Sequence, residues 1–253
     1  MKLCFASTNG RKNVIKNNLK DLRYILESFF YVEPWQIEEI KTVEHFMLDS
    51  GAFTFLNSKQ KVDIEKYVDK YINFINQHDI RYFFELDIDS IVGYEEVKRI
   101  RRKIERRTKK RCIPVWHKSR GIQDFRDMCK KYEYVSIGGI VTKEIPQREH
   151  FLLNAFCDYA HDKGCKIHAL GFTPSDLDKY RFDSVDSASW KFGGIYGKLY
   201  DFSNNRLTSY KPAKRLKTAE YDEHNIKQFK LFQEYLSSLN HIQNHYTSTS
   251  VRA

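Results

Sequence analysis

The residues of this sequence best suited to chemistry are acids and glycines that follow short apolar runs. Such runs end at Asp49, Asp87, Gly138 and Asp186. A buried, unpaired carboxylate is costly, so we expect these acids to leave the core and face a cleft from the ends of β-strands. Two carboxylates across a cleft can act as nucleophile and as general acid/base, as in retaining glycosidases. The repeated pattern predicts one pocket assembled from several loops.

Two of these positions leave an alternative open. The segment 182–190 holds both Asp183 and Asp186, and either could end its strand. Asp87 is followed closely by Asp89, and either of these acids could instead cap a helix. Asp49 precedes Ser50-Gly51, a pair that also suits a simple turn. The residue types alone therefore identify candidate site residues, but they do not assign a role to each of them.

Short β-prone runs alternate with amphipathic helical patterns along the chain, which predicts a parallel sheet. The predicted strands are 3–7, 46–49, 82–87, 112–117, 134–138, 166–171 and 184–186, with an eighth in 199–210. The predicted helices are 14–30, 64–75, 94–108, 122–131, 146–163 and 222–239, and residues 173–176 read as a further helix start. This order predicts an α/β protein with a single (β/α)8 TIM barrel over residues 1–245 and a flexible tail over 246–253. In such a barrel the strand C-termini share one face, which would bring the candidate residues together.

The balance of charge favours a polyanionic partner such as nucleic acid. The chain has 253 residues, a formal net charge of +10 and a pI near 9.2. The basic run 99–111 fits either a solvated outer helix face or a phosphate-contacting patch. A second basic cluster follows the predicted eighth strand, closer to the presumed cleft. It consists of Lys211, Lys214, Arg215 and Lys217.

Several function classes find no support in the sequence. Neither of the glycine-rich phosphate-binding motifs of dinucleotide and nucleoside-triphosphate folds occurs. The five cysteines are scattered without a C-x-x-C pair, so no disulfide framework or zinc ribbon is expected. Cys157, His161, Cys165 and His168 come closest to a metal set, but we interpret them as a helix end and the next strand. We expect a cytosolic, reduced protein with no metal, no cofactor and no membrane span.

Five motifs resemble the guanine transglycosylases, in their order and rough spacing over residues 45–210. They are Asp49-Ser50-Gly51-Ala52-Phe53, Leu86-Asp87-Ile88, Ile137-Gly138-Gly139-Ile140, Ala169-Leu170-Gly171 and Val185-Asp186-Ser187-Ala188. That family consists of TIM barrels that exchange a guanine base for a 7-deazaguanine. The resemblance implies Asp186 as the nucleophile, since Ser187-Ala188 follows it, and Asp49 as the general acid/base.

The same resemblance implies the residues that bind the base. They are Ser50, Asp87, His117, Gly138, Gly139, Leu170 and Gly171. Asp87 would hold the amino and ring N–H groups of the purine, and the Gly138-Gly139 backbone would reach its exocyclic oxygen. His117 departs in type from the polar residue that the family tends to carry. Phe53 and Tyr94 suit stacking on a purine, although both also suit the core.

The departures from the family bear on the substrate. No zinc-site spacing of the tRNA enzymes follows Asp186, and we expect no appended RNA-binding domain. In this the chain is closest in kind to the compact DNA-guanine transglycosylases of bacteriophages. The resemblance therefore implies DNA and a free 7-deazaguanine, such as preQ0 or a derivative, as partners. The alternatives are exchange on tRNA, base removal without replacement, and an inactive basic barrel that only binds nucleic acid.

Overall fold

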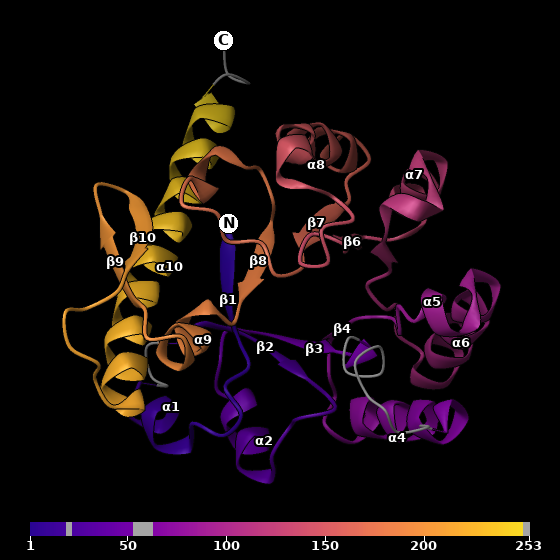
Figure 1. The fold of residues 1–253 in the computed structure, drawn as a ribbon. Helices are drawn as coiled ribbons and strands as arrows, with labels where there is room; N and C mark the ends of the chain where they lie inside the picture. Colours follow the sequence, from indigo (N-terminus) through magenta and orange to yellow (C-terminus); the bar gives the residue numbers. More distant parts are fainter. Residues whose placement is uncertain (19–21, 53–62, 250–253) are drawn as a thin grey trace.

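The centre of the molecule is an eight-stranded, all-parallel sheet that is curled and surrounded by helices (Figure 1). The computed structural model describes residues 1–18, 22–52 and 63–249. The strands are β1 (Lys2–Ala6), β2 (Tyr24–Ser28), β3 (His45–Asp49), β4 (Tyr82–Phe83), β5 (Val115–Trp116), β6 (Tyr134–Ile137), β7 (Lys166–Ala169) and β8 (Ser184–Ser187). Their order in the sheet is β4-β3-β2-β1-β8-β7-β6-β5.

The two edge strands of this sheet, β4 and β5, approach each other at a single isolated bridge between Phe84 and Ile113. The Ile113 N–H donates to the Phe83 oxygen at 2.8 Å, and the Glu85 N–H donates to the Ile113 oxygen at 3.0 Å. The fold is thus TIM-barrel-like, with a curled sheet that strand pairing does not close. The sequence predicted a complete (β/α)8 barrel, whereas the structure shows the barrel-like arrangement of strands and helices without closure of the sheet.

Side chains from both ends of the strand order fill the inside of the curl. This inner cluster includes Cys4, Leu26, Met47, Phe84, Val115 and Tyr134. The rings of Tyr82 on β4 and Tyr134 on β6 lie 6.1 Å apart, although β4 and β6 are far from neighbours in the sheet. Burial of apolar surface inside the curl therefore holds the strand ends in one ring of positions.

The outer face of the sheet packs against helices whose apolar residues recur at helical spacing. The helices are α1 (Lys12–Asn18), α2 (Pro34–Ile40), α4 (Ile64–Gln77), α5 (Asp89–Val92), α6 (Tyr94–Thr108), α7 (Ile122–Lys131), α8 (Leu153–Asp162), α9 (Ser189–Ile195) and α10 (Thr218–Thr249), with 3₁₀ turns η2 (Lys118–Arg120), η3 (Gln147–Leu152) and η4 (Leu177–Lys179). Helices α4 and α6 share one outer core with β3 and β4, whereas α7, α8 and α10 pack in another. The predictions for 94–108 and 122–131 are confirmed.

The predicted helix over 14–30 is wrong, because this region contains both a short helix and a strand. Helix α1 ends at Asn18, and β2 begins at Tyr24 and pairs with both β1 and β3. Four of the five residues of β2 are buried. A strand buried on both faces is apolar without alternation, and its run of apolar residues also satisfied helical spacing.

The strand that completes the eight-stranded sheet is therefore β2. The prediction of an eighth sheet strand within 199–210 is wrong. Residues 199–210 form an antiparallel hairpin of β9 (Leu199–Ser203) and β10 (Arg206–Tyr210), which lies against α10 outside the main sheet (Figure 1). Asn204 and Asn205 connect the two strands with φ values of 51° and 62°. Two residues with positive φ form the connection that suits the twist of a hairpin.

Several other predicted boundaries also differ from those in the structure; strands β4, β5 and β7, for example, are shorter than predicted. Residues 146–163 divide into the 3₁₀ turn η3 and the helix α8, and residues 173–176 lead only into the short turn η4. Helix α10 is longer than predicted, so residues 246–249 are helical, and residues 250–253 lie outside the described residues. Helix α2 was not predicted.

A buried ionic cluster ties the end of β4 to the next two βα units. Glu85 is fully buried and forms ion pairs of 3.0 Å with both Arg101 on α6 and Arg120 on η2. It also accepts a hydrogen bond of 2.8 Å from the Val115 N–H on β5. Because β4 and β5 are the sheet edges, this carboxylate links the two edges through side chains.

We expect Glu85→Ala to lower the free energy of unfolding by about 3 kcal/mol or more, because it leaves two buried guanidinium groups short of a counter-charge. Urea denaturation followed by circular dichroism measures this effect. The matched control is Glu65→Ala, which removes an exposed carboxylate that also pairs with two cations, Arg99 and Lys103. That change should cost about 1 kcal/mol or less. Equal losses for the two variants would contradict a structural role for the buried cluster.

Candidate active site

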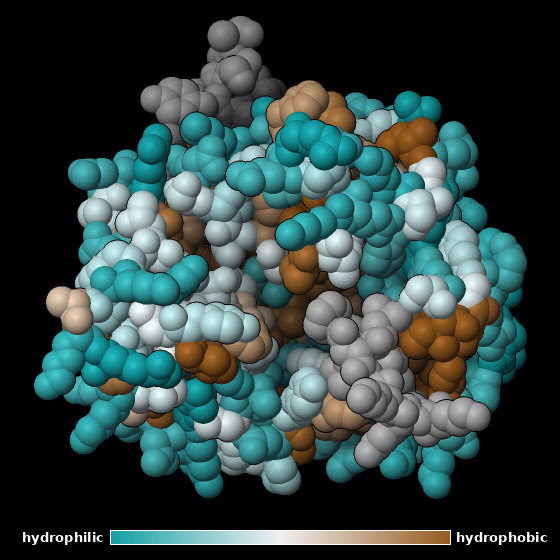
Figure 2. Space-filling model, viewed as in Figure 1, coloured by the Kyte–Doolittle hydropathy of each residue, from teal (hydrophilic) through white to brown (hydrophobic). Residues whose placement is uncertain are grey.

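A cavity of about 610 Å³ lies at the carboxyl ends of the strands and gathers most of the predicted site residues. Asp49, Asp87, His117, Gly138, Gly139, Leu170, Gly171 and Asp186 all line it. The space-filling view shows this face hollowed near its centre (Figure 2). Asp49 ends β3, Asp186 lies in β8, Asp87 comes four residues after the end of β4, and the others follow β5, β6 and β7. The parallel sheet therefore supplies the convergence that the sequence predicted.

Asp49 is the acid whose protonation is most altered by its surroundings. Burial raises the pKa of Asp49 to about 7, and the negative charges of Asp87 and Asp186 add to the effect. The Gly51 N–H donates to Asp49 Oδ2 at 3.0 Å, which only partly offsets the shift. A carboxyl with this pKa can release and take up a proton near neutral pH.

Backbone conformation and close packing explain why the Asp-Ser-Gly motif has a glycine at its third position. Gly51 has a φ of +80°, and a Cβ at this position would lie 2.8 Å from the Tyr67 hydroxyl oxygen. That hydroxyl donates to the Ser50 carbonyl at 2.7 Å. Gly51 therefore lets the chain turn sharply after β3 while its N–H points back to the Asp49 carboxylate.

Asp186 has one oxygen within hydrogen-bonding distance of two nitrogen atoms. Its Oδ1 accepts from the Gly171 N–H at 2.8 Å and lies 3.2 Å from His168 Nε2. Asp183, the alternative acid of this segment, lies elsewhere. It accepts from the Ile167 N–H at 2.8 Å and lines a different cavity, beside Met1 and Lys2. Of the two acids, only Asp186 shares a cavity with Asp49.

The opposite wall contains a chain of Asp87, His117 and Glu144. His117 Nε2 lies 3.1 Å from Asp87 Oδ2, and His117 Nδ1 lies 3.1 Å from Glu144 Oε2. Burial alone would lower the pKa of His117, but the hydrogen bond and charge of Asp87 outweigh it, so the pKa is raised. The imidazole between two carboxylates is thus disposed to carry a positive charge.

Asp89, the alternative to Asp87, serves another purpose. Its two oxygens bind Arg120, at 2.6 Å from Nε and 2.5 Å from Nη2. Burial opposes ionisation of Asp89, but the hydrogen bonds and charge of Arg120 lower its pKa overall. Asp89 therefore closes the buried ionic cluster, and Asp87 is the acid of this pair that lines the cavity.

Two further residues named from the sequence, Ser50 and Tyr94, do not line the cavity. Ser50 is fully buried, and its hydroxyl has no hydrogen-bond partner among the described residues. The Tyr94 hydroxyl donates to Asp124 at 2.7 Å, and its ring lies under the Arg120 guanidinium, 4.1 Å from the ring centroid. Phe53 lies outside the described residues.

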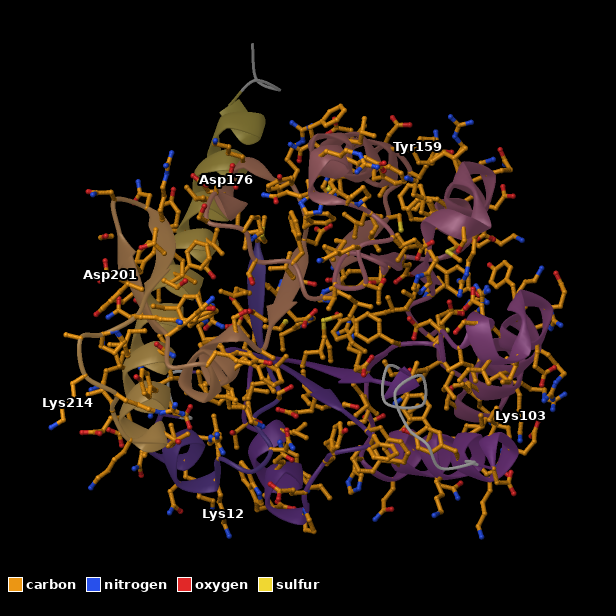
Figure 3. All side chains as sticks on the ribbon, viewed as in Figure 1. Lys12, Lys103, Tyr159, Asp176, Asp201 and Lys214 are labelled. Carbon is orange, nitrogen blue, oxygen red and sulfur yellow. The ribbon has the colours of Figure 1, made fainter. Side chains whose placement is uncertain are left out.

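The basic run 99–111 is largely used within the protein. Arg99 pairs with Glu65 and Glu96, and Lys103 lies 2.7 Å from Glu65 and 2.8 Å from Asp69. These pairs join α6 to α4 on the outside of the molecule, and Lys103 points outward there (Figure 3). The arrangement favours the solvated outer face over the phosphate-contacting patch.

The second basic cluster lies between β10 and α10 and does not line the cavity. Lys211, Lys214, Arg215 and Lys217 are all exposed. Lys214 projects at the edge of the molecule, beyond α10 (Figure 3). Among the described residues no ion pair involves any of the four. They remain candidates for contact with a polyanion outside the cavity.

Several cavity residues were missed in the sequence, for identifiable reasons. Ser28 and Tyr31 line the cavity after β2, the strand that was mistaken for a helix. Phe192 lines it from α9, and Val141 from the loop after β6. Recognition of β2 would have nominated its carboxyl end by the same rule as the others. Glu144 carried no such signal, because it meets His117 only in three dimensions.

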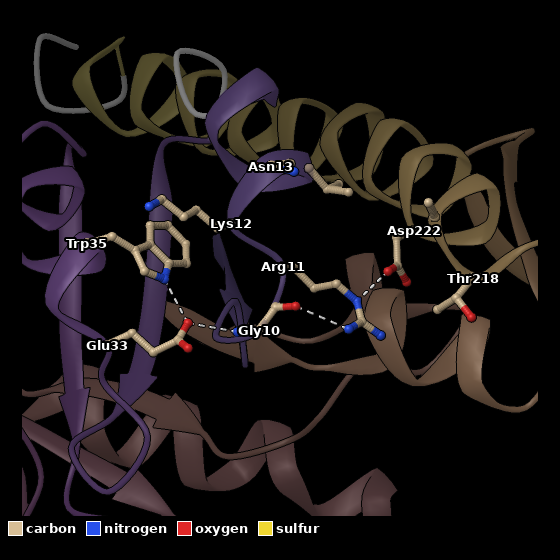
Figure 4. Close-up of a pocket in the computed structure, with 10 residues that line it drawn as sticks. Gly10, Arg11, Lys12, Asn13, Glu33, Trp35, Thr218 and Asp222 are labelled. Atoms are coloured by element: carbon tan, nitrogen blue, oxygen red, sulfur yellow. Dashed lines mark hydrogen bonds and ion pairs between the residues drawn. The ribbon is translucent and has the colours of Figure 1, made fainter.

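Two other cavities hold none of the residues assigned to catalysis or base binding. One, of about 580 Å³, lies between α1, α2 and the start of α10 (Figure 4). Within it, Arg11 pairs with Asp222, and Glu33 accepts from the Gly10 N–H at 2.9 Å. The other, of about 390 Å³, lies at the amino ends of β1 and β8 and contains Asp183.

In the part of the chain that the structure describes, no group of three or more His, Cys, Asp or Glu side chains is arranged to hold a metal ion. Of the metal set considered from the sequence, His168 contacts Ser184 and Asp186, and His161 contacts Asp183. None of the helices in residues 1–18, 22–52 and 63–249 is long and apolar enough to span a bilayer.

Comparison with known proteins gives no family. No protein-family model matches the chain, and no curated protein matches its sequence.

The raised pKa of Asp49 makes a prediction for stability. The folded state holds this proton more tightly than the unfolded chain, whose Asp pKa is about 3.9, so the Asp49 contribution to stability falls as pH rises from about 4 to 7. We expect Asp49→Asn to raise the free energy of unfolding at pH 8 by roughly 2–4 kcal/mol relative to wild type. The gain should nearly vanish at pH 4.

Urea denaturation at both pH values measures this difference. The matched control is Asp89→Asn, which removes a carboxylate with a lowered pKa and should instead destabilise the protein at pH 8. A gain for Asp49→Asn that is equal at pH 4 and pH 8 would contradict a buried carboxyl titrating near neutrality.

Proposed function

We propose that this protein exchanges guanine in DNA for a 7-deazaguanine, through a sugar covalently bound to Asp186. The observation that carries the proposal is that Asp49 and Asp186 line one cavity with Asp87. One of the acids takes up protons near neutral pH, and another has an oxygen fixed by two donors. This is the division of roles that exchange at an N-glycosidic bond requires. The proposal also assigns the TIM-barrel-like fold to the (β/α)8 barrels of the transglycosylase type.

In the first half of the reaction, the guanine leaves. With the nucleotide extruded into the cavity, an Asp186 carboxylate oxygen attacks C1′ from the face opposite the base. The C1′–N9 bond breaks, and its electron pair moves to the guanine. Asp49 gives its proton to the departing base, which leaves as neutral guanine. The sugar remains as an ester of Asp186, and Asp49 is left ionised.

In the second half, the 7-deazaguanine takes the place of guanine. Ionised Asp49 removes the proton from N9 of the incoming base, and N9 attacks C1′. The ester bond to Asp186 breaks, and its electron pair returns to the carboxylate. Asp49 is again protonated and Asp186 is again ionised, so the cycle needs no cofactor.

Recognition of the base falls to the wall opposite Asp186. Asp87 uses Oδ2 toward His117, and its other oxygen can accept from the N–H groups on the purine edge. The Gly138 N–H is already bonded to the Trp116 oxygen at 2.9 Å. The Gly139 N–H has no hydrogen bond among the described residues, and it is the donor that we assign to the exocyclic oxygen.

The electrostatics of the cavity support the proposed chemistry. Among the described residues that line it there are three aspartates and neither lysine nor arginine, although the chain carries a net charge of +10. Cleavage of an N-glycosidic bond builds positive charge on the sugar, which nearby carboxylates stabilise. The exposed cluster Lys211, Lys214, Arg215 and Lys217 is available to DNA phosphates outside the cavity.

We expect Asp186→Ala to reduce exchange by about 10³-fold or more, because it removes the nucleophile. The measurement is transfer of labelled 7-deazaguanine into acid-insoluble DNA. The matched control is Asp183→Asn, three residues away in another cavity, which should keep near-wild-type activity. Asp186→Ala should still bind DNA. Wild-type exchange by Asp186→Ala, or loss only in Asp183→Asn, would contradict the proposed nucleophile.

Competition between DNA and tRNA tests which polymer is the substrate. With DNA and tRNA supplied together and labelled 7-deazaguanine limiting, we expect the label in DNA. Label in tRNA alone would transfer the proposal to RNA, and abasic sites formed without added base would indicate a glycosidase. If wild-type protein labels neither polymer and releases no guanine, the exchange proposal is wrong.

A further inference from the structure

A chain of buried polar side chains leads to Asp186. It runs from Tyr134 on β6 through Ser184 on β8 to His168 on β7, which contacts the Asp186 carboxylate. The Tyr134 hydroxyl lies 2.5 Å from Ser184 Oγ, and Ser184 Oγ lies 2.5 Å from His168 Nδ1. His168 Nε2 then lies 3.2 Å from Asp186 Oδ1. His168 and Ser184 are fully buried, and Tyr134 is 8% exposed. Buried polar groups of this kind must be satisfied by one another.

The direction of each hydrogen bond follows from what each group can donate. An ionised Asp186 only accepts, so His168 Nε2 carries a proton and donates it to Oδ1. In neutral His168 the other nitrogen, Nδ1, must then accept, so Ser184 donates its hydroxyl proton to it. Ser184 Oγ in turn accepts from the Tyr134 hydroxyl. Every proton in the chain points toward Asp186.

The packing around His168 keeps the ring in this orientation. The Phe84 ring meets it edge to face, with the ring centroids 5.2 Å apart. His168 and Ser184 are paired across the register of β7 and β8, so the backbone fixes their separation. The alternative acceptor for the Ser184 proton is Met47 Sδ at 3.8 Å, a much weaker acceptor than an imidazole nitrogen.

We propose that His168 is a positioning residue, whose tautomer is set by Ser184 and Tyr134 and which selects the oxygen of Asp186 that attacks the sugar. His168 and the Gly171 N–H both bind Oδ1, and among the described residues no hydrogen bond reaches Oδ2. Oδ2 is therefore the nucleophilic oxygen, and rotation of the carboxylate is blocked. This inference rests on the proposed function for its consequence in catalysis, but the hydrogen-bond chain can be tested without activity.

The first test is imidazole nitrogen NMR of the full-length protein, with the His168 signals assigned by their loss in His168→Gln. We expect neutral His168 with the proton on Nε2 in the wild type. In Ser184→Ala the donor to Nδ1 is gone, so a population with the proton on Nδ1 should appear. A wild-type imidazolium, or a proton on Nδ1, would overturn the assignment whether or not the protein exchanges bases.

The second test is exchange kinetics with the same variants. We expect Ser184→Ala and His168→Phe to lower kcat about 10- to 100-fold with KM nearly unchanged, and His168→Gln, which keeps a donor, to recover most of the loss. Tyr134→Phe leaves the Ser184 donor in place and should change kcat only a few-fold. Thermal unfolding of each variant separates these effects from instability.

The outcomes distinguish the two proposals. If wild-type protein shows the Nε2 proton but exchanges no base, the hydrogen-bond chain stands and the proposed function fails. If exchange occurs but His168→Phe keeps the wild-type kcat, the function stands and the positioning role of His168 is wrong.

Discussion

The burial of several carboxylates around one cavity is the constraint on which the rest of the site depends. Burial raises the pKa of Asp49 to about 7, and the negative charges of Asp87 and Asp186 add to the shift, so the three acids cannot all be ionised at low cost. The surroundings sort the three acids. Asp186 receives two N–H donors on one oxygen, Asp87 faces an imidazole, and Asp49 receives a single backbone N–H from Gly51. In the proposed reaction, these partners would give identical side chains different chemical roles.

The curl of the sheet makes this gathering possible, and the same curl separates charge across the molecule. Mostly apolar side chains fill the inside of the curled sheet, and the carboxyl ends of its strands present polar groups to the cavity. The positive charge lies outside. On α6 much of it is used in ion pairs with α4, while the segment between β10 and α10 keeps exposed, unpaired cations among the described residues. An acidic hollow in a basic protein suits a reaction at a sugar that is carried by a polyanion.

The candidate site was more predictable than the fold that carries it. Acids near strand ends are visible in the sequence because a buried strand rarely tolerates them, and Asp49 at the end of β3 follows this rule. Asp186 departs from it, because it lies within β8 and is buried, with one carboxylate oxygen close to the Gly171 and His168 nitrogens. Strand β2 was missed because its run from Tyr24 to Leu26 is apolar on both faces and has no alternation. The hairpin at Asn204-Asn205 was missed although two consecutive Asn residues are a recognised signal for positive φ. Partners that meet only through the fold, such as His117 with Glu144, left no trace in sequence order.

The Gly-Gly motif after β6 shows how a sequence signal can have a cause within the protein. A Cβ at Gly138 would lie 2.7 Å from His117 Cε1, and a Cβ at Gly139 would lie 2.7 Å from Glu144 Oε2. Both glycines therefore make room within the protein for the side chains of His117 and Glu144, which continue the chain from Asp87. That chain places a positively disposed imidazole against one oxygen of Asp87 and leaves the other for the ligand. In the proposed reaction the motif would act on the base through the carboxylate that it allows His117 to hold.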